Sequence, residues 1–278
     1  MIHGINLYII DMHIKRGSNF YFVKLEELYM KLLLLLGSAI ALPSLAAGGG
    51  DLDIGDSVGV SFWLVTAAML AATVFFFVER DQVSAKWKTS LTVSGLITGI
   101  AFWHYLYMRG VWIDTGASPT VFRYIDWLLT VPLQMVEFYL ILAACTNVAA
   151  SLFKKLLVGS LVMLGAGFAG EAQLAPALPA FVVGMLGWLY MIKELYMGEG
   201  KAAVSTASPA VNSAYNAMMM IIVFGWSIYP LGYVAGYLMG AVDANTLNLI
   251  YNLADFVNKI LFGLIIWNVA VKESSHSH

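Results

Sequence analysis

Long apolar stretches, separated by short polar, glycine-containing or proline-containing segments, dominate the chain from residue 57 onward. A helix needs about 20 apolar residues to cross a hydrocarbon core roughly 30 Å thick. Stretches of this length cover residues 57–79, 87–109, 119–144, 151–171, 176–198, 208–237 and 246–271. They are continuously apolar, which excludes the alternating strands of about ten residues that build a membrane barrel. The pattern therefore predicts an all-α membrane protein, a bundle of seven transmembrane helices.

The composition agrees with this prediction and excludes several kinds of function. The chain of 278 residues is 60% hydrophobic and 12% charged, whereas about 25% of the residues in a typical soluble domain are charged. Its formal net charge of -2 provides no basic surface for nucleic acid. The single cysteine, Cys145, can form neither an internal disulfide nor a paired-cysteine metal or redox site. We expect no nucleic-acid partner, no metal site and no thiol chemistry.

The first 46 residues are expected to lie outside the bundle. Lys31 precedes a run of leucines, and small residues follow near residue 47, which is the order found in a secretory signal peptide. The alternative, an amphipathic or membrane helix over 20–45, is disfavoured by Pro43 and by the small residues after it. We expect an N-terminal extension over 1–29, a cleaved signal peptide over 30–46, a seven-helix domain over 47–272 and a C-terminal tail over 273–278.

Positive charge lies mainly at one end of the predicted bundle. Eight lysines and arginines fall in the loops of that end or near the C-terminus: Arg80, Lys86, Lys88, Lys154, Lys155, Lys193, Lys201 and Lys272. The opposite loops hold Arg109 alone. Because cytoplasmic loops carry an excess of Lys and Arg, this end is expected to face the cytoplasm. The mature N-terminus is then outside, as a cleaved signal also requires, and the C-terminus is cytoplasmic.

Five ionisable side chains interrupt the third and seventh apolar stretches: Arg123, Asp126, Glu137, Asp255 and Lys259. A charge at the centre of a bilayer costs several kcal/mol, so such residues are functional-site hypotheses by default. Eleven helical steps separate Asp126 from Glu137, which returns to within about 20° of the same face roughly 16 Å further along. Asp255 and Lys259 are four residues apart, and this spacing allows an ion pair.

The order of these groups across the membrane indicates a proton relay. Counting from the outer ends of the helices, Asp126 lies about 9–10 Å deep, Asp255 about 13 Å, Lys259 about 19 Å and Glu137 about 26 Å. An amine thus lies between an outer and an inner acid. His104, on the second stretch, is expected at the level of Asp126. The alternatives to a relay are that the Lys–Asp pair only stabilises the bundle and that His104 is an ordinary hydrogen-bonded interior residue.

These residues belong to segments that resemble the microbial rhodopsins and, within them, the proteorhodopsins, which are bacterial light-driven proton pumps. The segments are 123–127 with Thr130 and Glu137, 226–230, and 255–259, and the likeness extends from about residue 30 to residue 273. The resemblance implies a light-driven outward proton pump that generates a proton motive force. Such a protein is a transporter rather than an enzyme, and it crosses the bacterial inner membrane several times.

The resemblance also implies a role for each buried charge. Lys259 would carry all-trans retinal as a protonated Schiff base, and Asp126 would be its primary counterion and the proton acceptor. Asp255 would complete the counterion, with Arg123 nearby. Glu137 would return a proton from the cytoplasmic side, and its desolvation near the inner end favours the protonated form that a donor needs.

Further residues follow from the same resemblance. His104 would contact the acceptor and tune its titration. The retinal pocket would contain Tyr105, Trp127, Thr130, Gln134, Met163, Trp188, Trp226 and Tyr229. The glutamine at 134, where a leucine goes with green absorption, implies a blue-absorbing form. Pro230 frees a backbone carbonyl and permits a kink of the sixth helix.

Expected partners are the lipid bilayer, protons as the transported ion, and further copies of the chain in a pentamer or hexamer. Glu171 is a candidate for the group that releases the proton.

The main alternative function, a photosensory rhodopsin that signals through a partner, is disfavoured by Glu137. A sodium or chloride pump would need other residues at 126, 130 and 137. A ligand receptor would have longer inner loops. Residues 165–170 match the letters GxGxxG, but within an apolar stretch they indicate close helix contact rather than a nucleotide site.

Overall fold

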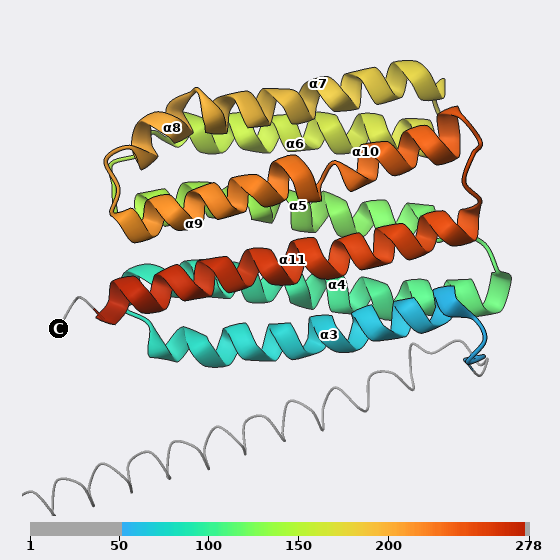
Figure 1. Ribbon diagram of the computed structural model, residues 1–278, viewed down its shortest axis with the longest axis horizontal. Helices are drawn as coiled ribbons and strands as arrows, with labels where there is room; N and C mark the ends of the chain where they lie inside the picture. Colours follow the sequence, from blue (N-terminus) through green and yellow to red (C-terminus); the bar gives the residue numbers. More distant parts are fainter. Residues whose placement is uncertain (1–51, 276–278) are drawn as a thin grey trace, which may run out of the picture. The chain divides into compact units, whose positions relative to one another are not determined.

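The computed structural model describes residues 52–275, which form a single bundle of long, roughly parallel helices (Figure 1). The helices are α3 (Ser57–Glu79), α4 (Lys88–Thr115), α5 (Thr120–Ala143), α6 (Ala150–Glu171), α7 (Ala177–Tyr196), α9 (Pro209–Met220) with α10 (Ile228–Tyr233), and α11 (Ala244–Ser275). Short turns of helix, η1 (Arg80–Gln82), η2 (Ala85–Trp87) and α8 (Glu199–Val204), lie in the connections. The prediction of seven helices is confirmed. The predicted extension over 1–29 and signal peptide over 30–46 lie outside the described residues.

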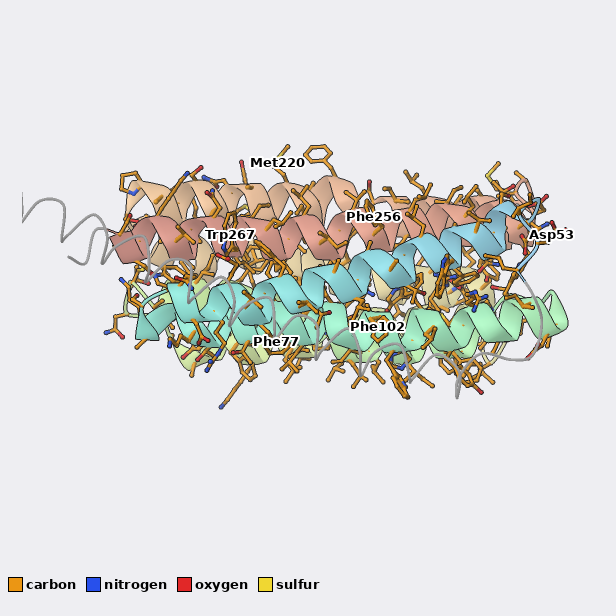
Figure 2. The ribbon with its side chains drawn as sticks, turned by 90° about the horizontal axis from the view of Figure 1, so that it is seen from below. Asp53, Phe77, Phe102, Met220, Phe256 and Trp267 are labelled. Atoms are coloured by element: carbon orange, nitrogen blue, oxygen red, sulfur yellow. The ribbon has the colours of Figure 1, made fainter. Side chains whose placement is uncertain are left out.

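The helices form two layers. In Figure 1, α3, α11, the α9–α10 pair and α7 lie side by side, and α4, α5 and α6 lie behind them. Large apolar side chains that point outward, such as Met220 (57% exposed) and Phe77 (39% exposed), are on opposite outer faces in Figure 2. This exposure suits a lipid environment, and the buried ionisable residues lie inside the bundle. The protein is a multi-pass membrane protein.

Helix α4 differs from the other long helices of the described segment. Six helices there are long and apolar enough to cross a membrane, and α4 is not among them although it has 28 residues. Its polar residues Ser90, Ser94 and Thr98 are buried against neighbouring helices. Packing therefore shields these polar side chains from lipid, while Leu96, Trp103 and Tyr107 of the same helix are exposed.

The end of α4 corrects one prediction. Arg109 was expected in an outer loop, but the helix continues to Thr115 and ends at Gly116, whose left-handed backbone (φ +63°) terminates the helical hydrogen bonding. The Arg109 guanidinium lies 4.9 Å from the ring centroid of Trp63 on α3. This cation–π contact stabilises a cation within the helix, so a loop position is not required.

The sixth helix is interrupted near its middle, as the position of Pro230 predicts. Regular α9 gives way to a wider π-helical stretch, η3 (Ile221–Gly225), a turn at 226–227, then α10 and a second π stretch, η4 (Val234–Leu238). Two side chains satisfy carbonyls freed at this break: the Asn258 amide donates to Gly225 O (3.0 Å) and the Trp188 indole donates to Ile222 O (3.1 Å). The predicted kink is confirmed as a local break with defined hydrogen-bond partners.

Glycines bring α6 and α7 into close contact. A Cβ added at Gly187 would lie 2.9 Å from both the Gly159 carbonyl oxygen and the Met163 nitrogen, which are backbone atoms that cannot rotate away. The predicted role of residues 165–170 is confirmed in part. Added carbons at Gly167 and Gly170 would approach Tyr124 and Ala180, but one at Gly165 would meet nothing within 4 Å.

We expect Gly187→Ala to lower the free energy of unfolding by about 1–3 kcal/mol, because the new methyl group forces the two helices apart. Gly165→Ala is the matched control and should be neutral or stabilise by about 0.5–1 kcal/mol through helix propensity. Detergent titration followed by far-ultraviolet circular dichroism measures both values. Equal stabilities would contradict the close packing of α6 on α7.

Candidate functional site

A buried cation with two carboxylates forms the centre of the bundle. The Lys259 amine, on α11, hydrogen-bonds the carboxylate of Asp126 on α5 and, at 3.0 Å, the carboxylate of Asp255 one turn earlier on α11. The exposed fractions of Lys259, Asp126 and Asp255 are 3%, 0% and 0%. The predicted ion pair is therefore confirmed as a three-membered cluster. Removing the amine would leave two carboxylates without a cation in contact in a medium of low dielectric constant.

Asp255 is the carboxylate with more hydrogen-bond donors. The hydroxyl of Tyr229 donates to it at 2.7 Å and that of Tyr105 at 2.9 Å, and the indole N–H of Trp127 lies 3.2 Å from both of its oxygens. These donors come from three further helices. Together with Lys259 they compensate for the water that this carboxylate loses on burial. Asp255 is thus held as a fixed anion.

Asp126 is less completely satisfied. One of its oxygens accepts from Lys259, whereas the other, Oδ1, is buried and has no hydrogen-bond partner within the described part of the chain. His104 Nδ1 lies 3.9 Å from this Oδ1 and 2.9 Å from the carbonyl oxygen of Ile100. The predicted proximity of His104 to Asp126 is confirmed, although the distance exceeds that of a hydrogen bond. Asp126 retains a lone pair that can accept a proton.

Arg123 is connected to the cluster through Tyr105. Its guanidinium is buried and donates to Asn248 Oδ1 (2.9 Å) and to the Tyr105 hydroxyl (3.3 Å), which itself donates to Asp255. The Tyr251 ring centroid lies 5.7 Å from the guanidinium carbon. Arg123 lies near the two carboxylates of the cluster, as predicted, but sequence reasoning missed its partners. Asn248 lies one helical turn before Asn252 and two before Asp255, on the same buried face of α11, and that periodicity was the available signal.

Glu137 is separate from the cluster and is also fully buried. It lies eleven residues beyond Asp126 on α5, so both acids are on the inward face, as predicted. The Ser94 hydroxyl lies 3.4 Å from Glu137 Oε1, and Oε2 has no hydrogen-bond partner among the described residues. A carboxyl with so little compensation is favoured in its neutral form.

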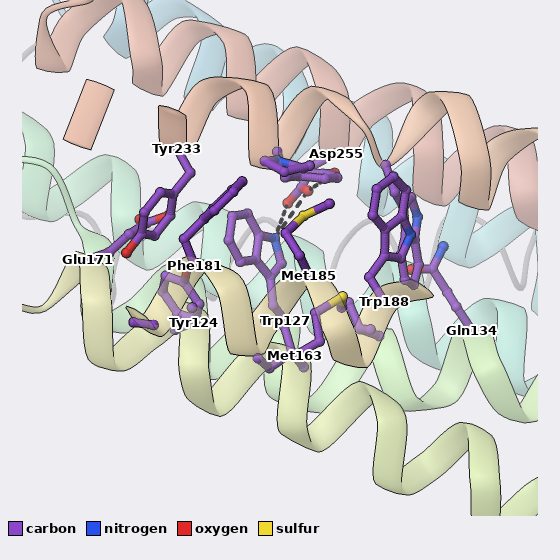
Figure 3. A pocket seen from close by; sticks show the side chains of 18 of the residues that line it. Tyr124, Trp127, Gln134, Met163, Glu171, Phe181, Met185, Trp188, Tyr233 and Asp255 are labelled. Atoms are coloured by element: carbon purple, nitrogen blue, oxygen red, sulfur yellow. Dashed lines mark hydrogen bonds between the residues drawn. The ribbon is translucent and has the colours of Figure 1, made fainter. Parts of the chain in front are cut away.

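A cavity of about 770 Å³, including the space at its mouth, lies beside Lys259 between α5, α6, α7, α10 and α11. Aromatic, methionine and aliphatic side chains form most of its wall (Figure 3). The predicted pocket residues that line it are Trp127, Gln134, Met163, Trp188, Trp226 and Tyr229. Gln134 and Trp188 lie at one end in Figure 3, and Glu171 and Tyr233 lie at the other.

Two predicted pocket residues do not line this cavity. Tyr105 instead donates to Asp255, and the Thr130 hydroxyl donates to the backbone oxygen of Asp126 (2.9 Å). Sequence reasoning also missed several lining residues: Tyr124, Val131, Leu164, Gly167, Ala180, Phe181, Gly184, Met185, Pro230 and Tyr233. Glycines on the facing helices α6 and α7 were the available signal, because a missing side chain leaves room for a ligand.

Comparison with known proteins identifies the family. The sequence pattern of the family described as "Bacteriorhodopsin-like protein" matches residues 56–273. The chain belongs to the bacteriorhodopsin-like proteins. It is 88% identical over 249 residues to the blue-light absorbing proteorhodopsin of Gamma-proteobacterium Hot 75m4, covering 89% of this chain and 99% of that one. It is 78% identical to the green-light absorbing proteorhodopsin of Gamma-proteobacterium EBAC31A08, covering 89% and 100%.

A solved structure gives the same result at the level of the fold. The crystal structure of blue light-absorbing proteorhodopsin from Med12 has a TM-score of 0.70 and 56% sequence identity with this chain. The alignment covers 78% of this chain and 100% of the Med12 chain. The resemblance of the sequence to proteorhodopsins is therefore confirmed. In this bacteriorhodopsin-like protein the site consists of the Lys259 cluster, the adjoining apolar cavity and the separate Glu137.

The hydroxyl of Tyr229 should contribute measurably to the stability of this bacteriorhodopsin-like bundle. We expect Tyr229→Phe to lower the free energy of unfolding by about 1–3 kcal/mol, because Asp255 loses a donor that lies only 2.7 Å away. Tyr107→Phe is the control, since Tyr107 is 46% exposed on the outer surface and should change stability little. Detergent unfolding compares the two, and a Tyr229→Phe protein as stable as the parent would show that this bond does not hold Asp255.

Proposed function

We propose that this chain is a light-driven proton pump that binds retinal covalently at Lys259 and moves protons outward. The Lys259 amine, held between two buried carboxylates at the wall of an apolar cavity, carries this proposal. The proteorhodopsins named above, one of them 88% identical, support it. So does Glu137, a further buried carboxyl eleven residues beyond Asp126 on α5.

The residues present fit retinal, an elongated apolar aldehyde. The cavity is mostly apolar, as small-molecule sites usually are. The Lys259 amine lies in its wall, and Asp126 and Asp255 compensate a positive charge on that nitrogen. When bound as a protonated Schiff base, retinal supplies a light-driven isomerisation that changes the direction and proton affinity of the Lys259 nitrogen.

Asp126 is the better proton acceptor of the two carboxylates. Its Oδ1 has no hydrogen-bond partner among the described residues, whereas Asp255 accepts from two hydroxyls and one indole N–H. Protonating Asp255 would weaken all of those hydrogen bonds, whereas protonating Asp126 would weaken only its hydrogen bond with Lys259. Asp126 therefore takes the proton, and Asp255 remains the anion.

Glu137 is the donor that restores the proton. Along α5 it lies about 16 Å from Asp126, so transfer to Lys259 needs water molecules or a movement of helices. The break in the sixth helix at 221–227 provides a hinge for such a movement, because Asn258, the neighbour of Lys259, donates to Gly225 O within it. A displacement at Lys259 is thereby passed to α9.

The direction of transport follows from the two ends of the bundle. Eight cations gather at the end that holds the C-terminus of α11, and cytoplasmic ends of membrane proteins are rich in Lys and Arg. Asp126 then lies toward the outer surface and Glu137 toward the cytoplasm of a bacterial inner membrane. We also propose a homo-oligomer, a pentamer or hexamer, and note that Trp63 presents a ring 44% exposed on the outer face of α3.

Gln134 supports blue absorption. Its side chain lines the cavity and its amide nitrogen lies 3.4 Å from the carbonyl oxygen of Asn258, next to Lys259. An amide dipole at this position acts on the charge distribution of a bound polyene. The relative with 88% identity is named as blue-light absorbing.

Illuminated cells that make this protein with all-trans retinal should acidify an unbuffered medium. Asp126→Asn should abolish the signal by removing the acceptor, and Glu137→Gln should slow the return of the proton by about 100-fold or more. Lys259→Ala is the control, and it should be folded, colourless and inactive. A protonophore should collapse the pH change. Acidification that survives Asp126→Asn, or that depends on sodium, would contradict the proton-pump mechanism.

Gln134→Leu should shift the absorption maximum to longer wavelength, because it replaces an amide dipole beside Lys259 with an apolar group of similar size. Val131→Ile is the control, since it changes shape but not polarity in the same wall of the cavity, one turn earlier. Visible spectra of the two purified variants measure the effect. An unchanged maximum in Gln134→Leu would remove the basis for a blue-absorbing form.

A further inference from the structure

One carboxylate in the last turn of α11 joins three other parts of the bundle. Glu273 Oε1 accepts a hydrogen bond from the Ser208 hydroxyl (2.6 Å). Its second oxygen lies 4.0 Å from Lys86 Nζ and 3.9 Å from Cys145 Sγ. Ser208 precedes α9, Lys86 lies in η2, and Cys145 follows α5. In the proposed topology this end of the bundle faces the cytoplasm, and none of these residues lines the cavity beside Lys259.

The hydrogen bond between Ser208 and Glu273 connects α9 to α11, which lie side by side in Figure 1. Ser208 also caps α9, because its side-chain oxygen accepts from the backbone N–H of Val211 (3.2 Å). A movement of the start of α9 away from α11 must therefore break the bond to Glu273. The Glu273 side chain is 18% exposed, so water can replace the serine hydroxyl and the bond can open reversibly.

Separation of α9 from α11 would also open an aromatic contact next to Glu137. The ring of Phe138, the residue after Glu137 on α5, lies 5.3 Å from that of Tyr215 on α9 and 5.8 Å from that of Phe262 on α11. The three aromatic residues are buried, with exposed fractions of 0%, 2% and 0%. Closely packed rings leave no room for water, so contact between α9 and α11 helps to keep water at this end away from Glu137.

We propose that the hydrogen bond between Ser208 and Glu273 is a latch that holds α9 against α11 and limits the entry of a proton to Glu137, a role that rests on the proposed pump. After Glu137 has given its proton to the Lys259 nitrogen, α9 moves about the break at 221–227 and the latch opens. One proton then passes from water at this end to the Glu137 carboxylate, which recovers its initial state. The two latch residues act through the position of α9, so they are positioning residues.

The test compares substitutions at Ser208 that keep the helix cap but change the latch. Aspartate and asparagine both supply a side-chain oxygen for the cap. Ser208→Asp places a second carboxylate against Glu273 and should open the latch, whereas Ser208→Asn offers an amide N–H in place of the hydroxyl and should keep it closed. Ser205→Asp is the control, because it adds the same charge to the same connection at an exposed residue whose hydroxyl donates to Ala202 O.

Two measurements are made on the retinal-loaded protein. Hydrogen–deuterium exchange in the dark follows the backbone amides of residues 209–220, and a pH-sensitive dye records proton uptake at the C-terminal end of α11 after one flash. We expect Ser208→Asp to speed both the exchange of α9 and the uptake about 3- to 10-fold, the size expected for the loss of one hydrogen bond. The exchange of α6, the absorption spectrum and the first transfer from Lys259 to Asp126 should not change.

A double variant makes the result specific to this bond. Ser208→Asp together with Glu273→Gln exchanges donor and acceptor, because the glutamine amide can donate to the new carboxylate. This variant should return both rates toward those of the parent. A general loss of stability would instead speed exchange in α6 as well, and a second substitution would not reverse it.

The outcomes separate the latch from the pump. Equal exchange and equal uptake in Ser208→Asp and Ser205→Asp would overturn the latch and leave the pump intact. Faster exchange of α9 without faster uptake would show that the bond holds α9 but does not limit proton entry, which also overturns the proposal. Absence of any light-driven proton uptake by the parent protein would overturn the pump and, with it, the role of the latch.

Discussion

The structure depends on the need to keep one buried amine charged. Lys259 is buried between Asp126 and Asp255, and the amine would be costly to bury without these carboxylates. Much of the surrounding arrangement satisfies this cluster. Asp255 accepts hydrogen bonds from Tyr105 on α4, Trp127 on α5 and Tyr229 on α10. One carboxylate thus restricts the rotation of three helices about their axes. Lys259, Asp255, Trp127 and Tyr229 also line the apolar cavity, so the cluster forms part of its wall.

The two carboxylates of the cluster differ in the number of hydrogen bonds that they accept, and this difference distinguishes them chemically. Asp255 is surrounded by donors, whereas Asp126 retains a buried oxygen with no hydrogen-bond partner among the residues that the structure describes. A symmetrical site would share a proton between both acids, as coupled carboxyls do. Asp255 accepts hydrogen bonds from three side chains besides Lys259, so the proposed pump would change the charge of Asp126 and keep that of Asp255.

Sequence periodicity could predict the helices and the inward faces of the buried charges, but not how neighbouring helices are rotated against each other. The separation of eleven residues places Asp126 and Glu137 on one face whatever surrounds them, and both are buried. By contrast, Tyr105 was expected in the pocket and instead donates to Asp255, because the rotation of α4 is set by packing against α3 and α5. Arg109 was expected in a loop because a charged residue ends an apolar stretch in the sequence. In the structure it lies within α4, where a cation–π contact with Trp63 stabilises it.

The polar character of α4 has a consequence for how the protein enters its membrane. A segment crosses into lipid from the insertion machinery when its own apolar content outweighs its polar residues. Helix α4 carries Ser90, Ser94, Thr98 and His104, and it is the long helix of residues 52–275 that lacks sufficient apolar length. These side chains meet their partners only after α3 and α5 are in place, as the Thr73–Thr98 hydroxyl contact with α3 (3.0 Å) shows. Helix α4 is therefore less stable alone in lipid than between α3 and α5, where Thr98 and Ser94 contact Thr73 and Glu137.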